Sequence, residues 1–365
     1  MKQALRGPDK NHHHRTAAQG AQTDQTVDNQ TYPSLLSKPV LVAGASGFVG
    51  SHIARQLRAQ GRQLRLLLRK SSKLDALRDL NAEIVYGDVL DPASLRTAMA
   101  GCGSVFYSVL DPRFWLTDAT PLYRNNVEGL RNAIDAALEC GVQRFIFTST
   151  MGTLGFNPDG AVTEDIPFNW CDKASPYILT RLEAETQLLA ACRERGLPGV
   201  ALCIANTYGP QDFQPTPHGQ MLADVAFGRA THVLDSSQPT VDVRDAAQAA
   251  LLAEQYGRAG ERYIIANEYV SQEQFCALAC AAGGGKPPKR IPLRTAYVIA
   301  WVVERLFKLV DRKDSLLSTD SVFLSNAFGR MDHGKASREL HWQPRPLAET
   351  IRDAVAWYAS QHPAT

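Results

Sequence analysis

The chain has 365 residues, is 44% hydrophobic and carries a net charge of +2, so one large or two moderate domains are expected and no polyanion such as nucleic acid is implied as a partner. Its seven cysteines are scattered without a C-x-x-C pair, which favours a reducing compartment over a disulfide framework. Residues 1–37 are polar and contain no apolar segment of the kind found in secretion signals, so we expect a disordered tail in which His12-His13-His14 is solvated.

The first predicted strand, Val40–Ala43, runs into a glycine-rich turn and then a helical pattern. Gly44, Gly47 and Gly50 form a G-x-x-G-x-x-G turn. Gly44 permits a tight turn, Gly47 lets a pyrophosphate approach the backbone, and Gly50 lets the helix pack closely on the strand. The free N–H groups at the start of the helix would face the phosphates. The stretch therefore predicts a dinucleotide-binding site, with a plain glycine-rich turn as the alternative.

The second predicted strand, over residues 63–69, ends at Arg69 and is followed by Lys70. A site that prefers NAD usually places a carboxylate here to accept hydrogen bonds from the ribose 2′-OH. A guanidinium and an ammonium suit the 2′-phosphate of NADP(H) instead. We therefore expect NADP(H), keep NAD(H) as possible, and note a basic surface loop as the alternative. The third strand, Glu83–Tyr86, is followed by Asp88, an acid able to hold the adenine.

Two further strands continue the alternation of strands and helices. Residues 104–109 predict the fourth strand, whose end should pass beneath the central part of the cofactor, and residues 144–148 predict the fifth. A helical pattern over residues 123–140 lies between them. This order predicts an α/β fold with a doubly wound parallel sheet of the Rossmann type.

The residues suited to catalysis follow the fifth strand. Thr150 lies at the C-terminal end of that strand, where such sheets bind ligands. Tyr177 and Arg181 are four residues apart and share a helix face. A cation beside the phenol should lower the pKa of Tyr177, which could then exchange a proton with a carbonyl oxygen that Thr150 also holds. An ordinary surface contact between Tyr177 and Arg181 is the alternative.

These segments together resemble an extended short-chain dehydrogenase/reductase of the NAD-dependent epimerase/dehydratase superfamily over residues 38–360. The branches that look most similar are dihydroflavonol reductases, 3β-hydroxysteroid dehydrogenases and hopanoid-associated epimerase-like proteins. The resemblance implies a catalytic hydroxyl at Thr150, counted back from Gly155, with Ser149 as the fallback. It also implies a homodimer formed by helices at 122–140 and 177–195.

The same resemblance implies a set of cofactor contacts. They are Gly44, Ser46, Gly47, Phe48, Val49, Gly50, Arg69, Asp88, Val89, Ser108, Asn126, Tyr177, Arg181 and Tyr208. No metal site is expected.

The chain departs from the family pattern at three places. The family's usual catalytic Ser is Thr150 here, which retains the hydroxyl. The family's Tyr-x-x-x-Lys is Tyr177-x-x-x-Arg181 here. The Lys normally hydrogen-bonds the nicotinamide ribose and lowers the Tyr pKa, and Arg keeps the charge but is longer and planar. The usual Asn-Pro pair after the sixth strand is Cys203-Ile204, in a region that lines the nicotinamide pocket in the family.

The later part of the chain is expected to bind the substrate. Residues 206–220 predict a shaped loop over the site, and residues 221–230 a short helix. We assign residues 38–205 and about 236–267 to the dinucleotide-binding domain. Residues 206–235 and 268–365 would then form a smaller, mainly C-terminal substrate-binding domain.

Residues 293–310 predict an amphipathic helix. Its charged residues keep it from being a transmembrane span. Three interpretations remain open: a lid that packs its apolar stripe over the substrate site, an interfacial membrane helix, or a core helix. The first two favour an apolar substrate. The stripe consists of Ile299, Val302, Val303, Leu306 and Val310.

The sequence predicts an NADP(H)-dependent oxidoreductase that interconverts a ketone and a secondary alcohol on a small apolar molecule of steroid, terpenoid, flavonoid or polyketide type. Tyr177 would be the acid/base. We expect the protein in the cytoplasm, either free or peripheral to the inner face of a membrane through residues 293–310. One alternative is a nucleotide-sugar epimerase or dehydratase with tightly bound NAD. The other is a non-catalytic cofactor-binding protein, suggested by Arg181.

Overall fold

The computed structural model describes residues 31–113, 116, 118–309 and 319–361. Most of the predicted tail, His12-His13-His14 included, lies outside these residues. The prediction of disorder is wrong for the last part of the tail, because Thr31–Leu36 form helix α1. The side chain of Leu35 is completely buried and packs against Gly103, so α1 is part of the folded protein.

A seven-stranded sheet forms the centre of the molecule, in the order β10-β6-β5-β4-β1-β2-β3. All of its strand pairs are parallel. Because the strand order reverses direction beside β1, the predicted doubly wound parallel sheet is confirmed. The strands are β1 (Val40–Ala43), β2 (Leu64–Leu68), β3 (Glu83–Tyr86), β4 (Ser104–Tyr107), β5 (Arg144–Thr150), β6 (Gly199–Ile204) and β10 (Arg262–Ile265).

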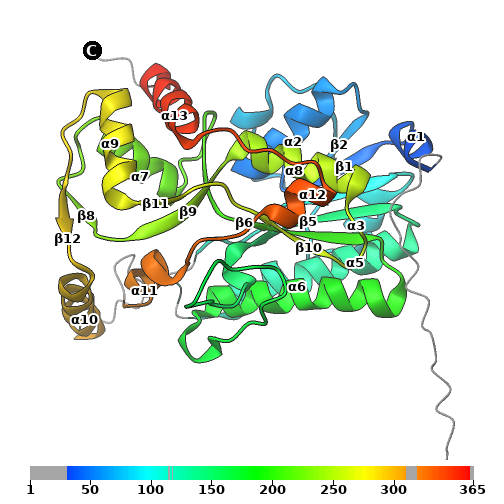
Figure 1. The fold of residues 1–365 in the computed structure, drawn as a ribbon. Coiled ribbons are helices and arrows are strands. Elements are labelled where there is room, and N and C mark those ends of the chain that lie inside the picture. The colour runs from blue at the N-terminus through cyan, green and yellow to red at the C-terminus, as the bar shows by residue number, and fades with distance from the viewer. Residues whose placement is uncertain (1–30, 114–115, 117, 310–318, 362–365) are drawn as a thin grey trace, which may run out of the picture.

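Helices cover both faces of this sheet (Figure 1). On one face, α2 (Phe48–Ala59) packs against α8 (Val243–Tyr256). On the other face lie α3 (Pro92–Met99), α5 (Gly129–Glu139) and α6 (Pro176–Arg195). The apolar sides of these helices form two cores, one on each side of the sheet, in which each fully buried Leu or Ile contributes roughly 1.5–3 kcal/mol.

The helix predicted over residues 123–140 is divided into three parts. It consists of α4 (Thr120–Tyr123), a π-helical turn η2 (Arg124–Glu128) and α5. π-Helical turns are rare overall, and those that do occur are often found at functional sites. Three short 3₁₀ turns, η1 (Asp75–Leu77), η3 (Met151–Thr153) and η4 (Cys171–Lys173), lie in the connections that follow β2 and β5.

A smaller unit lies beside the carboxyl end of the central sheet (Figure 1). It contains the three-stranded sheet β11-β9-β7 and the pair β12-β8. Helices α7, α9 and α13 share one apolar core. The elements of this unit are β7 (Asn206–Tyr208), α7 (Pro217–Ala226), β8 (His232–Leu234), β9 (Ser237–Asp242), β11 (Tyr269–Ser271), α9 (Gln272–Gly283), β12 (Lys289–Ile291), α10 (Leu293–Leu309), α11 (Thr319–Ala327) and α13 (Leu347–Gln361). Helix α12 (Gly334–Glu339) instead packs on β10, and its Ala336 lies in a core of the central sheet.

Two details of this unit differ from the prediction. The Thr216 hydroxyl accepts a hydrogen bond from the Gly219 N–H at 3.0 Å, and this cap starts α7 at Pro217, earlier than the predicted helix. Within the predicted cofactor-domain segment 236–267, α8 and β10 pack with the central sheet, whereas β9 pairs with β7 and β11. The predicted division into domains therefore remains a proposal.

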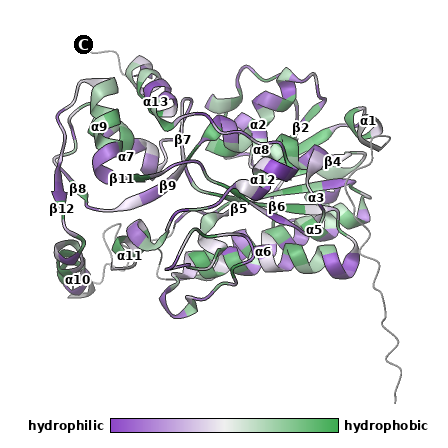
Figure 2. Cartoon of the chain, viewed as in Figure 1, coloured by the Kyte–Doolittle hydropathy of each residue, from purple (hydrophilic) through white to green (hydrophobic). Residues whose placement is uncertain are grey.

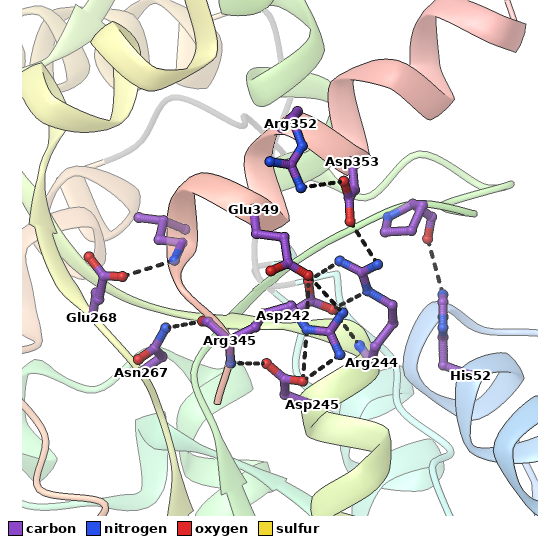
Figure 3. Close-up of polar contacts among 12 residues, drawn as sticks. His52, Asp242, Arg244, Asp245, Asn267, Glu268, Arg345, Glu349, Arg352 and Asp353 are labelled. Atoms are coloured by element: carbon purple, nitrogen blue, oxygen red, sulfur yellow. Dashed lines mark hydrogen bonds and ion pairs between the residues drawn. The ribbon is translucent and has the colours of Figure 1, made fainter. Parts of the chain in front are cut away.

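A cluster of ion pairs ties the C-terminal helix to the central unit (Figure 3). Asp242 accepts a hydrogen bond from the Arg244 N–H at 2.7 Å at the start of α8. The Arg244 guanidinium pairs with Asp242 and reaches Asp353 on α13 at 2.8 Å. Arg345 pairs with Asp245 at 2.8 Å. The strand-to-helix joint after β9 therefore anchors α13.

Helix α10 lies at the edge of the molecule, where Figures 1 and 2 show it beside α11. Three residues of its predicted apolar stripe face outward: Ile299 is 40% exposed, Val302 42% and Leu306 55%. The buried side consists of the small residues Ala296 and Ala300. The core interpretation is therefore wrong, and so is a lid that packs this stripe over the substrate site. Val310 lies outside the described residues. No helix in the described ranges is long and apolar enough to span a bilayer.

Candidate active site

The glycine-rich turn has the backbone geometry expected of a phosphate-binding loop. Gly44 has a φ of +85°, which side-chain-bearing residues rarely adopt. A Cβ on Gly50 would lie 2.2 Å from the Gly44 carbonyl oxygen, so only glycine allows α2 to approach the turn this closely. Gly47 is exposed and precedes α2, whose first turn carries no side-chain cap. The free N–H groups at this helix start therefore face the turn and suit a phosphate.

The other predicted residues of this loop lie at the same turn. Ser46, Phe48 and Val49 are partly buried. Gln214, from the segment between β7 and α7, donates a hydrogen bond from its side-chain amide to the Ser46 carbonyl at 3.1 Å. Sequence reasoning placed residues 206–220 over the site in general but did not identify this contact.

The two residues predicted at the adenosine end follow neighbouring strands. Arg69 follows β2 and Asp88 follows β3, and these strands pair in parallel, so both residues lie at the same edge of the sheet. Arg69 is exposed, and its guanidinium has no hydrogen-bond or ion-pair partner among residues 31–113 or the later described ranges. The Asp88 carboxylate accepts a hydrogen bond from the Leu90 N–H at 2.9 Å, and Val89 is buried beside Gly129.

Helix α6 supplies Tyr177 and Arg181. The Ser175 hydroxyl caps the helix by accepting a hydrogen bond from the Ile178 N–H at 3.4 Å. Pro176 occupies the first helical position, as its fixed φ and missing N–H favour. Tyr177 therefore lies in the first turn, partly exposed, and Arg181 lies one turn deeper.

Arg181 is buried with part of its hydrogen-bonding capacity unused. Its side chain is 1% exposed, its Nη2 donates to the Thr148 carbonyl at 2.6 Å, and its Cζ lies 4.8 Å from the centroid of the Phe147 ring. Its Nε and Nη1 have no partner within the part of the chain that the structure describes. Leaving buried donors unpaired is costly, so these N–H groups suit ligand acceptors such as the ribose hydroxyls of a nicotinamide cofactor.

The electrostatic effect predicted for Tyr177 is present but does not dominate. Burial raises the pKa of Tyr177 above its ordinary value because a phenolate is poorly solvated there. The charge of Arg181 lowers this pKa and that of Asp111 raises it, and the net shift is upward. The prediction of a lowered pKa is therefore wrong for the protein without its ligands. The same burial lowers the pKa of Arg181.

Thr150 and Ser149 point in different directions because side chains alternate along β5. The Thr150 hydroxyl accepts a hydrogen bond from the Gly152 N–H at 3.2 Å, and its own proton has no acceptor in the described residues. Gly152 packs against Ile178 in the first turn of α6. The turn that follows Thr150 therefore lies next to the helical turn that contains Tyr177. Ser149 instead donates to the buried carboxylate of Glu185, so the structure favours Thr150 over the fallback.

Glu185 is the centre of a buried network that sequence reasoning missed. Its carboxylate accepts hydrogen bonds from Thr153 at 2.8 Å and Cys203 at 3.5 Å and pairs with Arg262 at 3.1 Å. Cys203 is completely buried, and burial raises the pKa of its thiol well above the usual value. Cys203 thus belongs to this network and does not line a pocket. The spacing of Glu185, four residues after Arg181, was the available signal.

Asn126 and Ser108 hold adjoining backbone segments. Asn126, in the turn η2, accepts a hydrogen bond from the Asp111 N–H at 2.8 Å and donates to the Thr180 hydroxyl at 3.3 Å. It therefore connects the loop after β4 to α6. Ser108 follows β4 and accepts a hydrogen bond from the Thr148 hydroxyl at 3.2 Å, at the end of β5. Both residues lie where the central part of a cofactor is expected.

Tyr208 does not lie with the other predicted cofactor contacts. Its side chain is buried, its hydroxyl donates to Gln238 at 3.1 Å, and its ring lies 4.9 Å from that of Phe275. Because β7 belongs to the small sheet, this side chain packs in the core of the smaller unit. The prediction that Tyr208 contacts the cofactor is wrong for its side chain.

An apolar wall borders the turn that carries Thr150. The Trp170 ring stacks on Phe156 at 4.7 Å and lies 6.0 Å from Phe323 of α11, and the Trp170 indole N–H donates to the Leu154 carbonyl at 2.9 Å. We call this group the aromatic wall. It consists of Phe156, Phe168, Trp170, Phe323 and Phe328.

Comparison with known proteins agrees with this arrangement. Residues 40–266 match the model of the NAD dependent epimerase/dehydratase family. Sterol demethylase protein B of Methylococcus capsulatus is 31% identical over 87% of this chain and 97% of that protein. A 2-alkyl-3-oxoalkanoate reductase of Stenotrophomonas maltophilia is 31% identical over 74% of this chain and 84% of that protein. The crystal structure of gox2253 superposes with a TM-score of 0.80 at 33% identity, covering 89% of this chain and 99% of that chain.

Proposed function

The chain belongs to the NAD-dependent epimerase/dehydratase family and is an NAD(P)-dependent oxidoreductase, and we propose that it uses NADP(H) to interconvert a ketone and a secondary alcohol on a small apolar molecule. The observation that carries this proposal is the buried Arg181 guanidinium, one helical turn from Tyr177, whose Nε and Nη1 have no partner in the described residues. An ordinary surface contact between the two side chains would leave the arginine exposed.

The chain's own residues divide the work of holding the cofactor. The loop Gly44–Gly50 and the start of α2 bind the pyrophosphate, and Arg181 donates to the nicotinamide ribose through Nε and Nη1. The bound nicotinamide supplies or accepts the hydride. Asn126 holds the loop after β4 against helix α6, and both segments border the proposed cofactor position.

Tyr177 and Thr150 act on the substrate oxygen. Because its pKa is raised, Tyr177 is a neutral phenol at neutral pH and can donate its proton to the carbonyl oxygen during reduction. The unused proton of the Thr150 hydroxyl provides a second hydrogen bond to the same oxygen. In the oxidation direction the phenolate takes the proton back, and the positive charge of Arg181 stabilises that phenolate.

Arg69 and the aromatic wall support the choice of cofactor and substrate. Arg69 is an exposed guanidinium without a partner in the described ranges, at the strand end where a 2′-phosphate would lie. The aromatic wall is an apolar cluster joined to the turn that follows Thr150 by the hydrogen bond from Trp170 to the Leu154 carbonyl. The names of the two relatives mention a sterol and an alkylated oxoalkanoate, which supports an apolar ketone or alcohol of steroid, terpenoid, flavonoid or polyketide type. We also propose that the protein forms a homodimer through its helices at residues 122–140 and 177–195.

Titration of the purified protein with NADPH and NADH, followed by tryptophan fluorescence, tests the cofactor. We expect NADPH to bind at least tenfold more tightly. A panel of apolar ketones then tests the reaction, with Tyr177→Phe as the matched variant that binds NADPH but does not turn over. NAD that co-purifies and resists removal would favour the epimerase alternative. Tight NADPH binding without turnover of any ketone would favour the non-catalytic alternative.

A further inference from the structure

Helix α10 presents one exposed face that carries both arginines and apolar side chains. Arg294, Val298, Trp301 and Arg305 are spaced at i, i+4, i+7 and i+11 and form one row along the helix. All four are exposed, as are Val302 and Leu306 in the next row. The Arg305 guanidinium lies 5.1 Å from the centroid of the Trp301 ring. Apolar side chains thus occupy the middle of the face, and an arginine lies toward each end.

The opposite face fixes the orientation of α10. Ala296 and Ala300 are buried against Val322 of α11. Glu304, the only acidic residue of α10, accepts hydrogen bonds from the Thr319 N–H at 2.6 Å and its hydroxyl at 3.0 Å, at the start of α11. The carboxylate is therefore turned inward, and the outward charges of α10 between residues 293 and 306 are those of Arg294 and Arg305.

The segment before α10 carries three further cations, of which Arg290 is already paired with Asp235 and Glu273. Lys286 and Lys289, which precede α10, are exposed. A second copy of this face laid against the first would bring Arg294, Arg305 and these lysines together with their counterparts, because a two-fold interface pairs identical patches. Like charges disfavour that pairing, whereas the phosphates of an anionic bilayer complement the arginines, and its acyl chains complement the valines and Trp301.

We propose that the exposed face of α10 docks the protein on the surface of a membrane that contains anionic phospholipid, with Val298, Trp301, Val302 and Leu306 in the interfacial layer. This docking surface goes beyond the proposed reaction and does not depend on it. Phe323 of α11 connects the two sites, because α11 packs on α10 and its Phe323 contributes to the aromatic wall. Docking therefore places the wall of the candidate active site near an apolar phase.

Flotation of the full chain with lipid vesicles tests the proposal without any measurement of activity. The probes are vesicles of phosphatidylcholine alone and of phosphatidylcholine with 30% phosphatidylglycerol. The variants are Val302→Asp, the pair Arg294→Glu/Arg305→Glu, and the control Leu36→Asp on α1. Leu36 is 39% exposed and Val302 42%, so the two aspartates disturb the fold to a similar degree.

We expect the wild type and Leu36→Asp to float with the anionic vesicles, and at least tenfold less with phosphatidylcholine alone. Val302→Asp and the charge-reversal pair should each lose at least tenfold of the binding to anionic vesicles. The proposal is overturned if the wild type does not float with anionic vesicles, or if Val302→Asp floats as well as Leu36→Asp. Sedimentation that shows a wild-type dimer dissociated by Val302→Asp, without vesicle binding, would assign the face to a second copy instead.

Discussion

Replacement of Arg181 by lysine tests whether this site is adapted to arginine or impaired by it. In the structure, Nη2 of the guanidinium donates to the Thr148 carbonyl, and Nε and Nη1 have no partner in the described residues; in the proposed function these two nitrogens bind the cofactor. The plane of the group also lies over the Phe147 ring. A lysine ammonium is a single donor centre on a shorter stem, so it cannot keep the contact with Thr148 and also reach the ribose.

The expected loss follows from one charge-assisted hydrogen bond. Losing such a bond costs about 1.5–3 kcal/mol, and each 1.4 kcal/mol is tenfold in affinity or rate, so Arg181→Lys should weaken NADPH binding or kcat/KM by roughly ten- to a hundredfold. Arg181→Met, which removes the charge, should also raise the pKa of Tyr177 further, since the arginine charge lowers it. Reduction uses the protonated phenol, so the decline of the reduction rate at high pH should shift to higher pH in this variant.

Fluorescence titration with NADPH and steady-state kinetics of ketone reduction from pH 6 to 10 measure these effects. Arg193→Lys is the matched control, because Arg193 lies on the same helix but is exposed, and we expect it to behave as the wild type. An Arg181→Lys variant that reduces ketones as fast as the wild type, or faster, would refute the reasoning and indicate that the native site is impaired.

Three further predictions test other parts of the site. Arg69→Glu should weaken NADPH binding at least tenfold and leave NADH binding nearly unchanged, measured by the same titration; equal losses for both cofactors would contradict a contact with the 2′-phosphate. Glu185→Gln should lower the free energy of unfolding by about 2–3 kcal/mol in urea denaturation, because Arg262 loses its buried carboxylate; an unchanged midpoint would show that the network is not stabilising. Gly50→Ala should abolish cofactor binding, because its Cβ would lie 2.2 Å from the Gly44 carbonyl oxygen; normal NADPH affinity would mean that the loop adapts.

The parts of the fold that sequence predicted correctly are those whose signal is local. The strand Val40–Ala43, the glycine turn and the start of α2 are adjacent in the chain, and Gly44 and Gly50 each have a backbone reason for being there. The start of α6 is also set locally, because the Ser175 cap and Pro176 place Tyr177 in the first turn of the helix. The alternation of strands and helices then predicted a doubly wound parallel sheet, because parallel strands require such connections.

The predictions that were wrong concern features that depend on residues distant in the chain. Tyr208 follows a recognisable motif, but its side chain direction is set by the pairing of β7 with β9, which no local pattern reveals. The outward orientation of α10 depends on α11, where Val322 packs on the small buried residues of α10 and Thr319 binds Glu304. The predicted lowering of the Tyr177 pKa was wrong for a related reason, since the desolvation that raises this pKa comes from the whole surrounding fold.

Helix α6 explains how one element serves both the reaction and the stability of the fold. Tyr177, Arg181 and Glu185 lie one turn apart on the same face; Tyr177 is partly exposed, whereas Arg181 and Glu185 are buried. In the proposed mechanism Tyr177 meets the substrate and Arg181 binds both β5 and the cofactor, while Glu185 is held by Arg262 of β10. Because the buried end is anchored to β5 and β10, the helix cannot rotate to satisfy Arg181 internally. Its two unpaired donors are thus maintained by the fold for a ligand to fill.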